Sequence, residues 1–170
     1  MILDTGPLVA LVDGRDKDHV WSVAQWSDIE PPLLTCESVI SEACFLLART
    51  RAGGTPVLEM LARGALVIAF RLDEHVRGVR TLMRKYADVP MSLADACLVR
   101  MAEVTAHGMV LTLDRDFTIY RRHGRQVIPL VIPASRTRQA RTSADPVGHL
   151  LARHLAGRGE SRARPASSPR

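Results

Sequence analysis

The feature that most constrains the fold is a regular alternation of short apolar runs with segments of helical periodicity. The apolar runs stand at residues 2–4, 33–35, 65–70, 109–113 and 127–133, and the helical patterns at 8–12, 16–26, 37–49, 56–62, 73–86, 92–106 and 117–121. This order predicts an α/β fold with a parallel sheet covered by helices on both faces. The unbroken run at 65–70 is typical of a buried strand, and the prolines in 127–133 favour an edge or strand-end position.

The positive charge of the chain is concentrated at its C-terminal end. Residues 135–170 carry eight Arg and two acids, whereas residues 1–134 carry 15 basic and 16 acidic residues. The last segment is also rich in Ser, Pro, Gly and Ala, a composition that cannot bury much apolar surface. We therefore expect a folded domain at 1–134 and a basic, mostly disordered tail at 135–170. The sequence of the folded domain itself reveals no strong basic patch.

The three cysteines, Cys36, Cys44 and Cys97, fit neither a disulfide framework nor a zinc-binding spacing. The apolar sequence around Cys44 and Cys97 favours small core residues, and an odd number of cysteines fits a reducing compartment. No apolar stretch approaches the roughly 20 residues of a membrane span, and Asp4 interrupts the first apolar run at once. We expect a soluble, cytoplasmic protein without membrane contact.

Two aspartates follow predicted strands directly. Asp4 ends the first strand, and Asp114 ends the strand that contains Leu111–Leu113. Because ligands of open parallel sheets bind beyond the carboxyl ends of the strands, both side chains are candidates for a binding site. The alternatives are a turn residue before Gly6 for Asp4 and a helix N-cap for Asp114.

Two further acids belong to predicted helices. Asp95 has apolar helical neighbours, including Leu98 and Val99, and no basic residue three or four positions away. A carboxylate in an apolar stripe is costly unless it is paired or binds a metal ion, although a hydrogen-bonded core carboxylate is the alternative. Glu42 is the weaker candidate, since it also fits an exposed position at the edge of its helix stripe.

We refer to Asp4, Glu42, Asp95 and Asp114 as the four acids. Carboxylates gathered at one sheet edge repel one another, which raises their pKa values, and a bound cation offsets that repulsion. Oxygen ligands without neighbouring His or Cys select hard ions such as Mg²⁺ or Mn²⁺. Such a site suits the hydrolysis of phosphodiester bonds.

Four short motifs within residues 1–133 resemble, in order and spacing, those of the PIN domain, and most closely those of VapC-type toxins. They are ILDTGPLVA at 2–10, VISEA at 39–43, SLADA at 92–96 and LTLDRDF at 111–117. The resemblance implies a three-layer α/β/α PIN-like fold with a central parallel sheet of four to five short strands. It also implies a Mg²⁺- or Mn²⁺-dependent endoribonuclease, a homodimer, and inhibition by a cognate antitoxin in a VapBC-type module.

By the same resemblance, the four acids hold the metal ion and carry out catalysis. Thr5 and Thr112 would orient them through hydrogen bonds, and Asp116 is an additional acid near the site. A 36-residue tail is not part of the family's usual core.

Basic residues near the fourth motif are candidates for contacts with RNA phosphates. Arg115, Arg121 and Arg122, with Arg125 beside them, follow the fourth motif and are the local candidates. For each one taken alone, a solvated helix end is the simpler interpretation.

Other functions remain open at this point. The chain could be a PIN-domain RNA-processing nuclease outside a toxin–antitoxin pair, or a catalytically silent PIN-like binding module. The Asp4-Thr5-Gly6 tripeptide also occurs in aspartic proteases, but those are all-β and need a second such tripeptide, which this chain lacks. A haloacid-dehalogenase-like phosphatase needs a second Asp at position 6, which is Gly.

Overall fold

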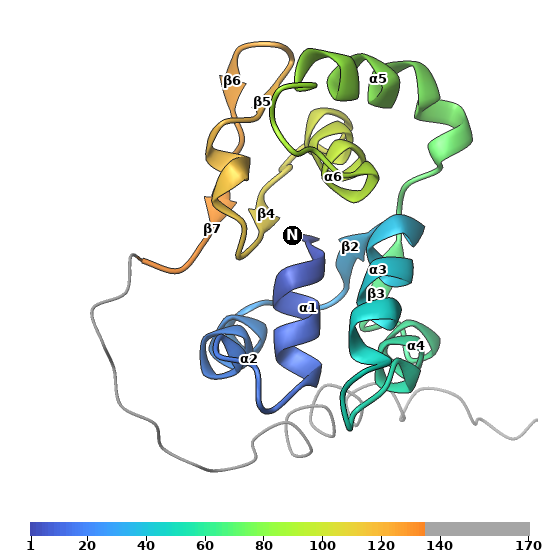
Figure 1. Cartoon of the computed structure of the whole chain (residues 1–170), viewed down its shortest axis with the longest axis vertical. Coiled ribbons are helices and arrows are strands. Elements are labelled where there is room, and N and C mark those ends of the chain that lie inside the picture. The colour runs from blue at the N-terminus through green and yellow to red at the C-terminus, as the bar shows by residue number, and fades with distance from the viewer. Residues whose placement is uncertain (135–170) are drawn as a thin grey trace, which may run out of the picture.

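A five-stranded parallel sheet forms the centre of the molecule (Figure 1). A computed structural model describes residues 1–134, so the expected tail at 135–170 lies outside the described residues. In spatial order the strands are β3 (Leu66–Ile68), β2 (Leu33–Thr35), β1 (Ile2–Leu3), β4 (Val110–Leu111) and β7 (Leu130–Val131). The parallel sheet predicted from the alternating pattern is therefore confirmed.

Helices cover both faces of this sheet, which confirms the three-layer α/β/α architecture. The helices are α1 (Thr5–Val12), α2 (His19–Asp28), α3 (Glu37–Leu47), α4 (Thr55–Ala62), α5 (Leu72–Lys85), α6 (Leu93–Val104) and the 3₁₀ helix η1 (Arg115–Thr118). In Figure 1, α1–α4 lie on one side of β1, and α5 and α6 lie on the other. Within residues 1–134, no helix has both the length and the apolar character that crossing a bilayer requires.

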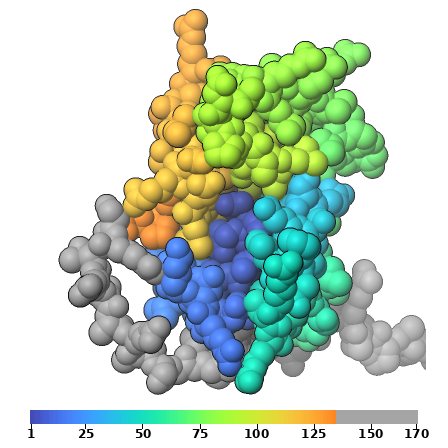
Figure 2. Space-filling model, in the orientation of Figure 1, coloured from blue at the N-terminus to red at the C-terminus, as the bar shows by residue number. Residues whose placement is uncertain are grey.

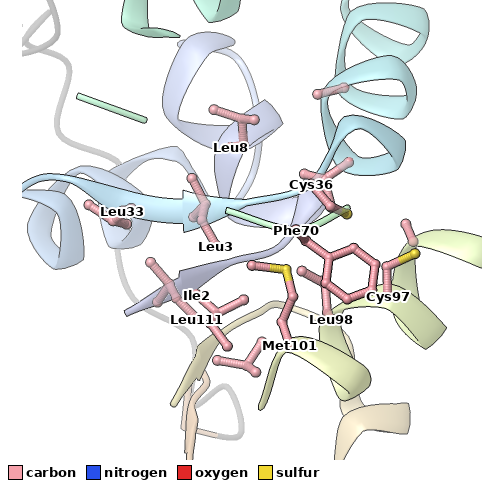
Figure 3. Packing of buried hydrophobic residues seen from close by; sticks show 14 of the residues in the cluster. Ile2, Leu3, Leu8, Leu33, Cys36, Phe70, Cys97, Leu98, Met101 and Leu111 are labelled. Carbon is pink, nitrogen blue, oxygen red and sulfur yellow. The ribbon is translucent and has the colours of Figure 1, made fainter. Parts of the chain in front are cut away.

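The core lies on both faces of the central strands. Figure 3 shows Leu8 of α1 on one side of the sheet and Leu98 and Met101 of α6 on the other. Ile2 and Leu3 point to opposite faces, as neighbouring residues of a strand must, and both are fully buried. Because the core holds Ile2 and Leu3 from both faces, it also fixes the position of Asp4, which follows them directly.

The first helix begins earlier than the pattern predicted. We expected Gly6-Pro7 to break the chain before a helix at 8–12, but α1 starts at Thr5, with Asp4 as its N-cap. Proline is tolerated in a first helical turn because the amide groups there have no intrahelical partner. Gly6 lies at a close approach, since a Cβ atom at this position would lie 3.2 Å from Cβ of Leu113, which would have to shift.

The two edge strands had different outcomes. The strand predicted within 65–70 is confirmed by β3, but its expected burial is wrong, because β3 is an edge strand and Val67 and Ile68 are each 38% exposed. The prediction of an edge position for the last strand is confirmed by β7.

A small hairpin replaces the helix expected at 117–121. The 3₁₀ helix η1 ends at Thr118, and β5 (Arg121–Arg122) then pairs antiparallel with β6 (Gln126–Val127). The chain reverses at His123 and Gly124, which both have positive φ, a region that glycine adopts without strain.

Candidate active site

The site is built at the carboxyl ends of two neighbouring strands. β1 and β4 pair in parallel with Ile2 opposite Val110 and Leu3 opposite Leu111, so the chain leaves both strands at the same edge. The backbone N–H of Asp4 donates to the carbonyl of Leu111 at 3.0 Å, which extends the pairing to the first acid. The structure thus places Asp4 and the segment from Thr112 onward side by side, as the sequence predicted.

Asp4 is the most buried of the four acids, with 5% of its surface exposed. Its Oδ1 accepts the backbone N–H of Thr5 at 2.6 Å, and its Oδ2 accepts the hydroxyl of Thr112 at 2.6 Å. Burial raises the pKa of Asp4 to about 7, although the two hydrogen bonds act to lower it. The negative charges of Asp95 and Asp114 raise this pKa as well, so the three carboxylates are electrostatically coupled.

A single buried hydroxyl connects Asp4 to Asp114. Thr112 Oγ1, which donates to Asp4, also accepts the backbone N–H of Asp114 at 2.9 Å. Asp114 itself is exposed and is the N-cap of η1, where its Oδ1 accepts the backbone N–H of Asp116 at 2.9 Å. The alternative helix-capping role of Asp114 is therefore real, and its second oxygen has no hydrogen bond within residues 1–134. Asp116 is half-buried beside it.

Asp95 differs from the expected carboxylate buried in an apolar stripe without a local partner. It is the third residue of α6 and only half-buried, and its Oδ2 accepts the backbone N–H of Ser92 at 2.8 Å. Ser92 Oγ in turn accepts the N–H of Asp95, which completes a capping box. Asp95 is therefore hydrogen-bonded, as the alternative expected, but it lies at a helix start and is not a core carboxylate. The motif SLAD carried the capping signal that the sequence analysis missed.

Burial raises the pKa of Asp95 while the Ser92 bonds lower it, and the charges of Asp114 and Glu42 raise it further. Glu42 is exposed on α3, as its alternative interpretation expected. Its Oε2 accepts the hydroxyl of Thr5 at 2.8 Å, and Thr5 directly follows Asp4. The two threonines therefore connect three of the four acids, and electrostatic repulsion extends the group to Asp95.

The four acids fit a hard divalent cation by their chemistry. They offer carboxylate oxygens alone, and the pKa values of Asp4 and Asp95 are raised in a way that a neighbouring positive charge would reverse. Over residues 1–134, no three His, Cys, Asp or Glu side chains converge closely enough to count as a formed metal cage. The structure therefore brings the predicted acids into one neighbourhood without closing them around a common point.

Tyr120 is a residue near this site to which the sequence analysis gave no role. Its side chain is fully buried, and its hydroxyl has no hydrogen-bond partner within the described part of the chain. Burial raises its pKa, and the charges of Asp95, Asp116 and Asp114 raise it further, which places the phenol close to the acids. No short motif could have identified it, because its position depends on the packing of the chain after η1.

An open groove adjoins Glu42. Its volume is about 710 Å³, and it runs between α3 and the start of α6. The residues that line it are Glu37, Ser38, Ser41, Glu42, Phe45, Ser92, Leu93 and Ala94. The capping residue of α6 and the acid of α3 thus share one accessible surface beside the site.

The candidate phosphate-binding arginines divide into two groups. The Nη1 atom of Arg121 donates to the carbonyls of Thr118, Ile119 and Tyr120, so this guanidinium caps the end of η1. Arg115 is exposed, and Arg122 is half-buried. Neither has an ion pair or a side-chain hydrogen bond within residues 1–134.

Two comparisons with known proteins agree with this geometry. The family model described as PIN domain matches residues 1–122. Ribonuclease VapC26 of Mycobacterium tuberculosis (strain ATCC 25618 / H37Rv) is 33% identical over 119 residues, which cover 68% of this chain and 87% of that relative. All four acids lie within the matched range, 1–122.

Proposed function

The chain belongs to the PIN domain family, and from this premise we propose that it is an endoribonuclease whose catalytic residues are the four acids. The observation that supports this proposal most strongly is the coupling of the acids at one sheet edge. Thr112 bonds both Asp4 and the backbone of Asp114. Burial raises the pKa of Asp4 to about 7, and the negative charges of Asp95 and Asp114 act in the same direction. A purely structural acid at a helix N-cap does not need two further carboxylates beside it.

We propose Mg²⁺ or Mn²⁺ as the cofactor, held by Asp4, Asp95 and Asp114 with Glu42. When bound, such an ion supplies a Lewis acid for the phosphate and lowers the pKa of a water molecule. Without a neighbouring cation, Asp4 holds a proton below about pH 7, because burial disfavours its charged form.

The chain's own residues then have separate tasks. Thr112 fixes the rotamer of Asp4, and the N–H of Thr5 holds its other oxygen. The hydroxyl of Thr5 orients Glu42, whose exposed carboxylate can accept a proton from an attacking water.

We further propose that the protein is the toxin of a VapBC-type module, a cytoplasmic homodimer inhibited by a cognate antitoxin. The support is the 33% identity to a relative named as a VapC ribonuclease. The competing candidates are an RNA-processing nuclease outside such a pair and a silent binding module. The neighbouring genes distinguish these candidates. A small upstream reading frame that overlaps this gene and encodes a co-purifying inhibitor would support the toxin. Absence of such a frame would favour the RNA-processing nuclease.

The direct test of the enzymatic proposal is incubation of the purified full chain with total RNA in Mg²⁺, Mn²⁺ or EDTA, followed by mapping of the cut ends. We expect cleavage with either metal and none in EDTA. Asp95→Asn and Asp114→Asn should each lower the rate at least about 100-fold, since even residues behind metal ligands cost 10–100-fold. Asp88→Asn, at an exposed loop position, is the matched control. An inactive wild type, or amide variants as active as the control, would refute the proposal.

A further inference from the structure

Two segments of the domain carry basic residues and no acids. Residues 76–87 contain four, namely Arg77, Arg80, Arg84 and Lys85, and residues 117–127 contain three, namely Arg121, Arg122 and Arg125. In the sequence they are separated by 29 residues that hold all the acids of that region from Asp88 to Asp116. Neither segment alone stands out, which is why the sequence revealed no strong basic patch.

The fold joins these two segments into one surface. Lys85 Nζ, at the end of α5, donates to the carbonyl of Gly124 in the hairpin turn at 3.0 Å. The hydroxyl of Tyr86 accepts the backbone N–H of Arg121 at 2.9 Å, and the rings of Tyr86 and Tyr120 meet edge to face at 5.1 Å. Figures 1 and 2 show α5 and the β5–β6 hairpin adjoining at the same end of the molecule.

We call this surface the basic face and define it by Arg77, Arg80, Arg84, Lys85, Arg122 and Arg125. On α5, Val79 and Leu82 are buried, whereas Arg77, Arg80 and Arg84 follow a spacing of three and four residues on the exposed side. Within residues 1–134, none of these three arginines forms an ion pair.

The ordinary explanation for such a row is a solvated helix face. It accounts for Arg71, which pairs with Asp73 and Glu74 at the start of α5. It also accounts in part for Arg84, because a cation in the last helical turn interacts favourably with the helix dipole. Arg77 and Arg80 lie in mid-helix, away from the helix end that favours cations, and form no ion pair with any residue of 1–134.

The basic face also has a favourable position relative to the four acids. Residues 71–134 hold ten basic and seven acidic residues, whereas residues 1–70 hold five basic and nine acidic ones. A polyanion is therefore repelled from the half that contains α1–α4 and attracted to the half that contains α5 and the hairpin. Tyr120, which directly precedes the hairpin, packs against Tyr86 at the end of α5 and lies within electrostatic reach of Asp95 and Asp114. The basic face therefore adjoins the acids that lie in the same half of the chain.

We propose that the basic face binds the phosphate backbone of the RNA substrate and delivers the strand to the four acids. This inference rests on the proposed function, because it takes the polyanion to be the same RNA that is cleaved. Backbone contacts position a nucleic acid without reading its sequence, so the basic face sets affinity and path, and the site residues and the adjoining groove set selectivity.

The test compares two full-length triple variants for binding of a fluorescent single-stranded RNA of 20 nucleotides in EDTA. The first is Arg77→Gln with Arg80→Gln and Arg84→Gln. The matched control is Arg15→Gln with Arg51→Gln and Arg63→Gln, three exposed arginines of the half that contains α1–α4. Both variants lose three charges and keep the same tail. Glutamine is a good helix former, so α5 should be retained, as far-UV circular dichroism can verify.

Each phosphate contact on a single strand contributes about −0.7 to the slope of log K against log salt. Loss of three contacts therefore reduces the magnitude of the slope by about 2. If the variant and the wild type bind equally at 1 M salt, the variant should bind roughly 100-fold more weakly than the wild type at 0.1 M salt. The control should retain the wild-type slope. Equal slopes and affinities in the two triple variants would overturn the proposal that the basic face binds RNA.

A separate cleavage assay keeps this outcome distinct from the proposed function. If the wild type cleaves RNA and the two variants bind it alike, the proposal that the basic face binds RNA is wrong and the enzymatic proposal is supported. If the wild type binds RNA through the basic face and does not cleave it with Mg²⁺ or Mn²⁺, the binding surface stands and the enzymatic proposal is wrong.

Discussion

Replacing Asp4 by Asn should stabilise the protein in the absence of metal ions. The folded-state pKa of Asp4 is raised from the ordinary 3.8 to about 7, so between these values the folded state binds a proton that the unfolded state has lost. The stabilisation by protonated Asp4 is complete below pH 3.8 and disappears as the pH rises through 7. One pKa unit corresponds to about 1.4 kcal/mol, so the loss by pH 8 approaches about 4 kcal/mol. Asn keeps a carbonyl oxygen for the N–H of Thr5 and carries no charge.

The assay is urea unfolding in EDTA at several pH values from 4 to 8, for the wild type, Asp4→Asn and the exposed control Asp88→Asn. The free energy of unfolding of the wild type should fall relative to that of Asp4→Asn as the pH rises, with most of the change between pH 4 and 7. Asp88→Asn should follow the wild type. A constant difference between wild type and Asp4→Asn over this pH range would refute the reasoning, because it would mean that Asp4 titrates alike in both states.

Three further substitutions test individual contacts of the structure by the same unfolding assay. Thr112→Val removes the hydroxyl between Asp4 and the backbone of Asp114, so it should cost about 1–3 kcal/mol and move the pH transition of Asp4 upward; an unchanged transition would count against the Thr112 bond. Ser92→Ala removes the N-cap of α6 and should cost about 1 kcal/mol, whereas no loss would mean that the capping box contributes nothing. Leu98→Ala empties a fully buried position and should cost about 2–5 kcal/mol, and a cost below 1 kcal/mol would contradict the packing of α6 on the sheet.

Much of the sheet could be predicted because strands and helices leave local patterns in the sequence. Short apolar runs between helical patterns specify parallel strands, and parallel strands end at one edge, so Asp4 and Asp114 had to emerge there together. Their distance along the chain did not matter. The role of the four acids in metal binding and cleavage stays a prediction, since geometry alone does not report activity.

The parts that could not be predicted depend on the ends and edges of elements. Helical periodicity placed Asp95 on an apolar stripe, but the third residue of a helix lies where the backbone N–H groups and the Ser92 cap are available. Apolar content suggested that 65–70 is covered on both faces, yet content does not specify the edge of a sheet, where Val67 and Ile68 are partly exposed. The basic face escaped detection because tertiary contacts such as Lys85 with Gly124 create it.

The measurement that tests the central claim most directly is a calorimetric titration of the metal-free full chain with Mn²⁺ at pH 8. The wild type and Asp88→Asn should bind the ion, and Asp4→Asn and Asp95→Asn should lose most of the binding, because each substitution removes a carboxylate from the coupled group. At pH 6 the wild type should bind more weakly and release a proton, since the pKa of Asp4 is about 7. Binding of equal strength in all four proteins, or in none, would contradict a metal site formed by the four acids.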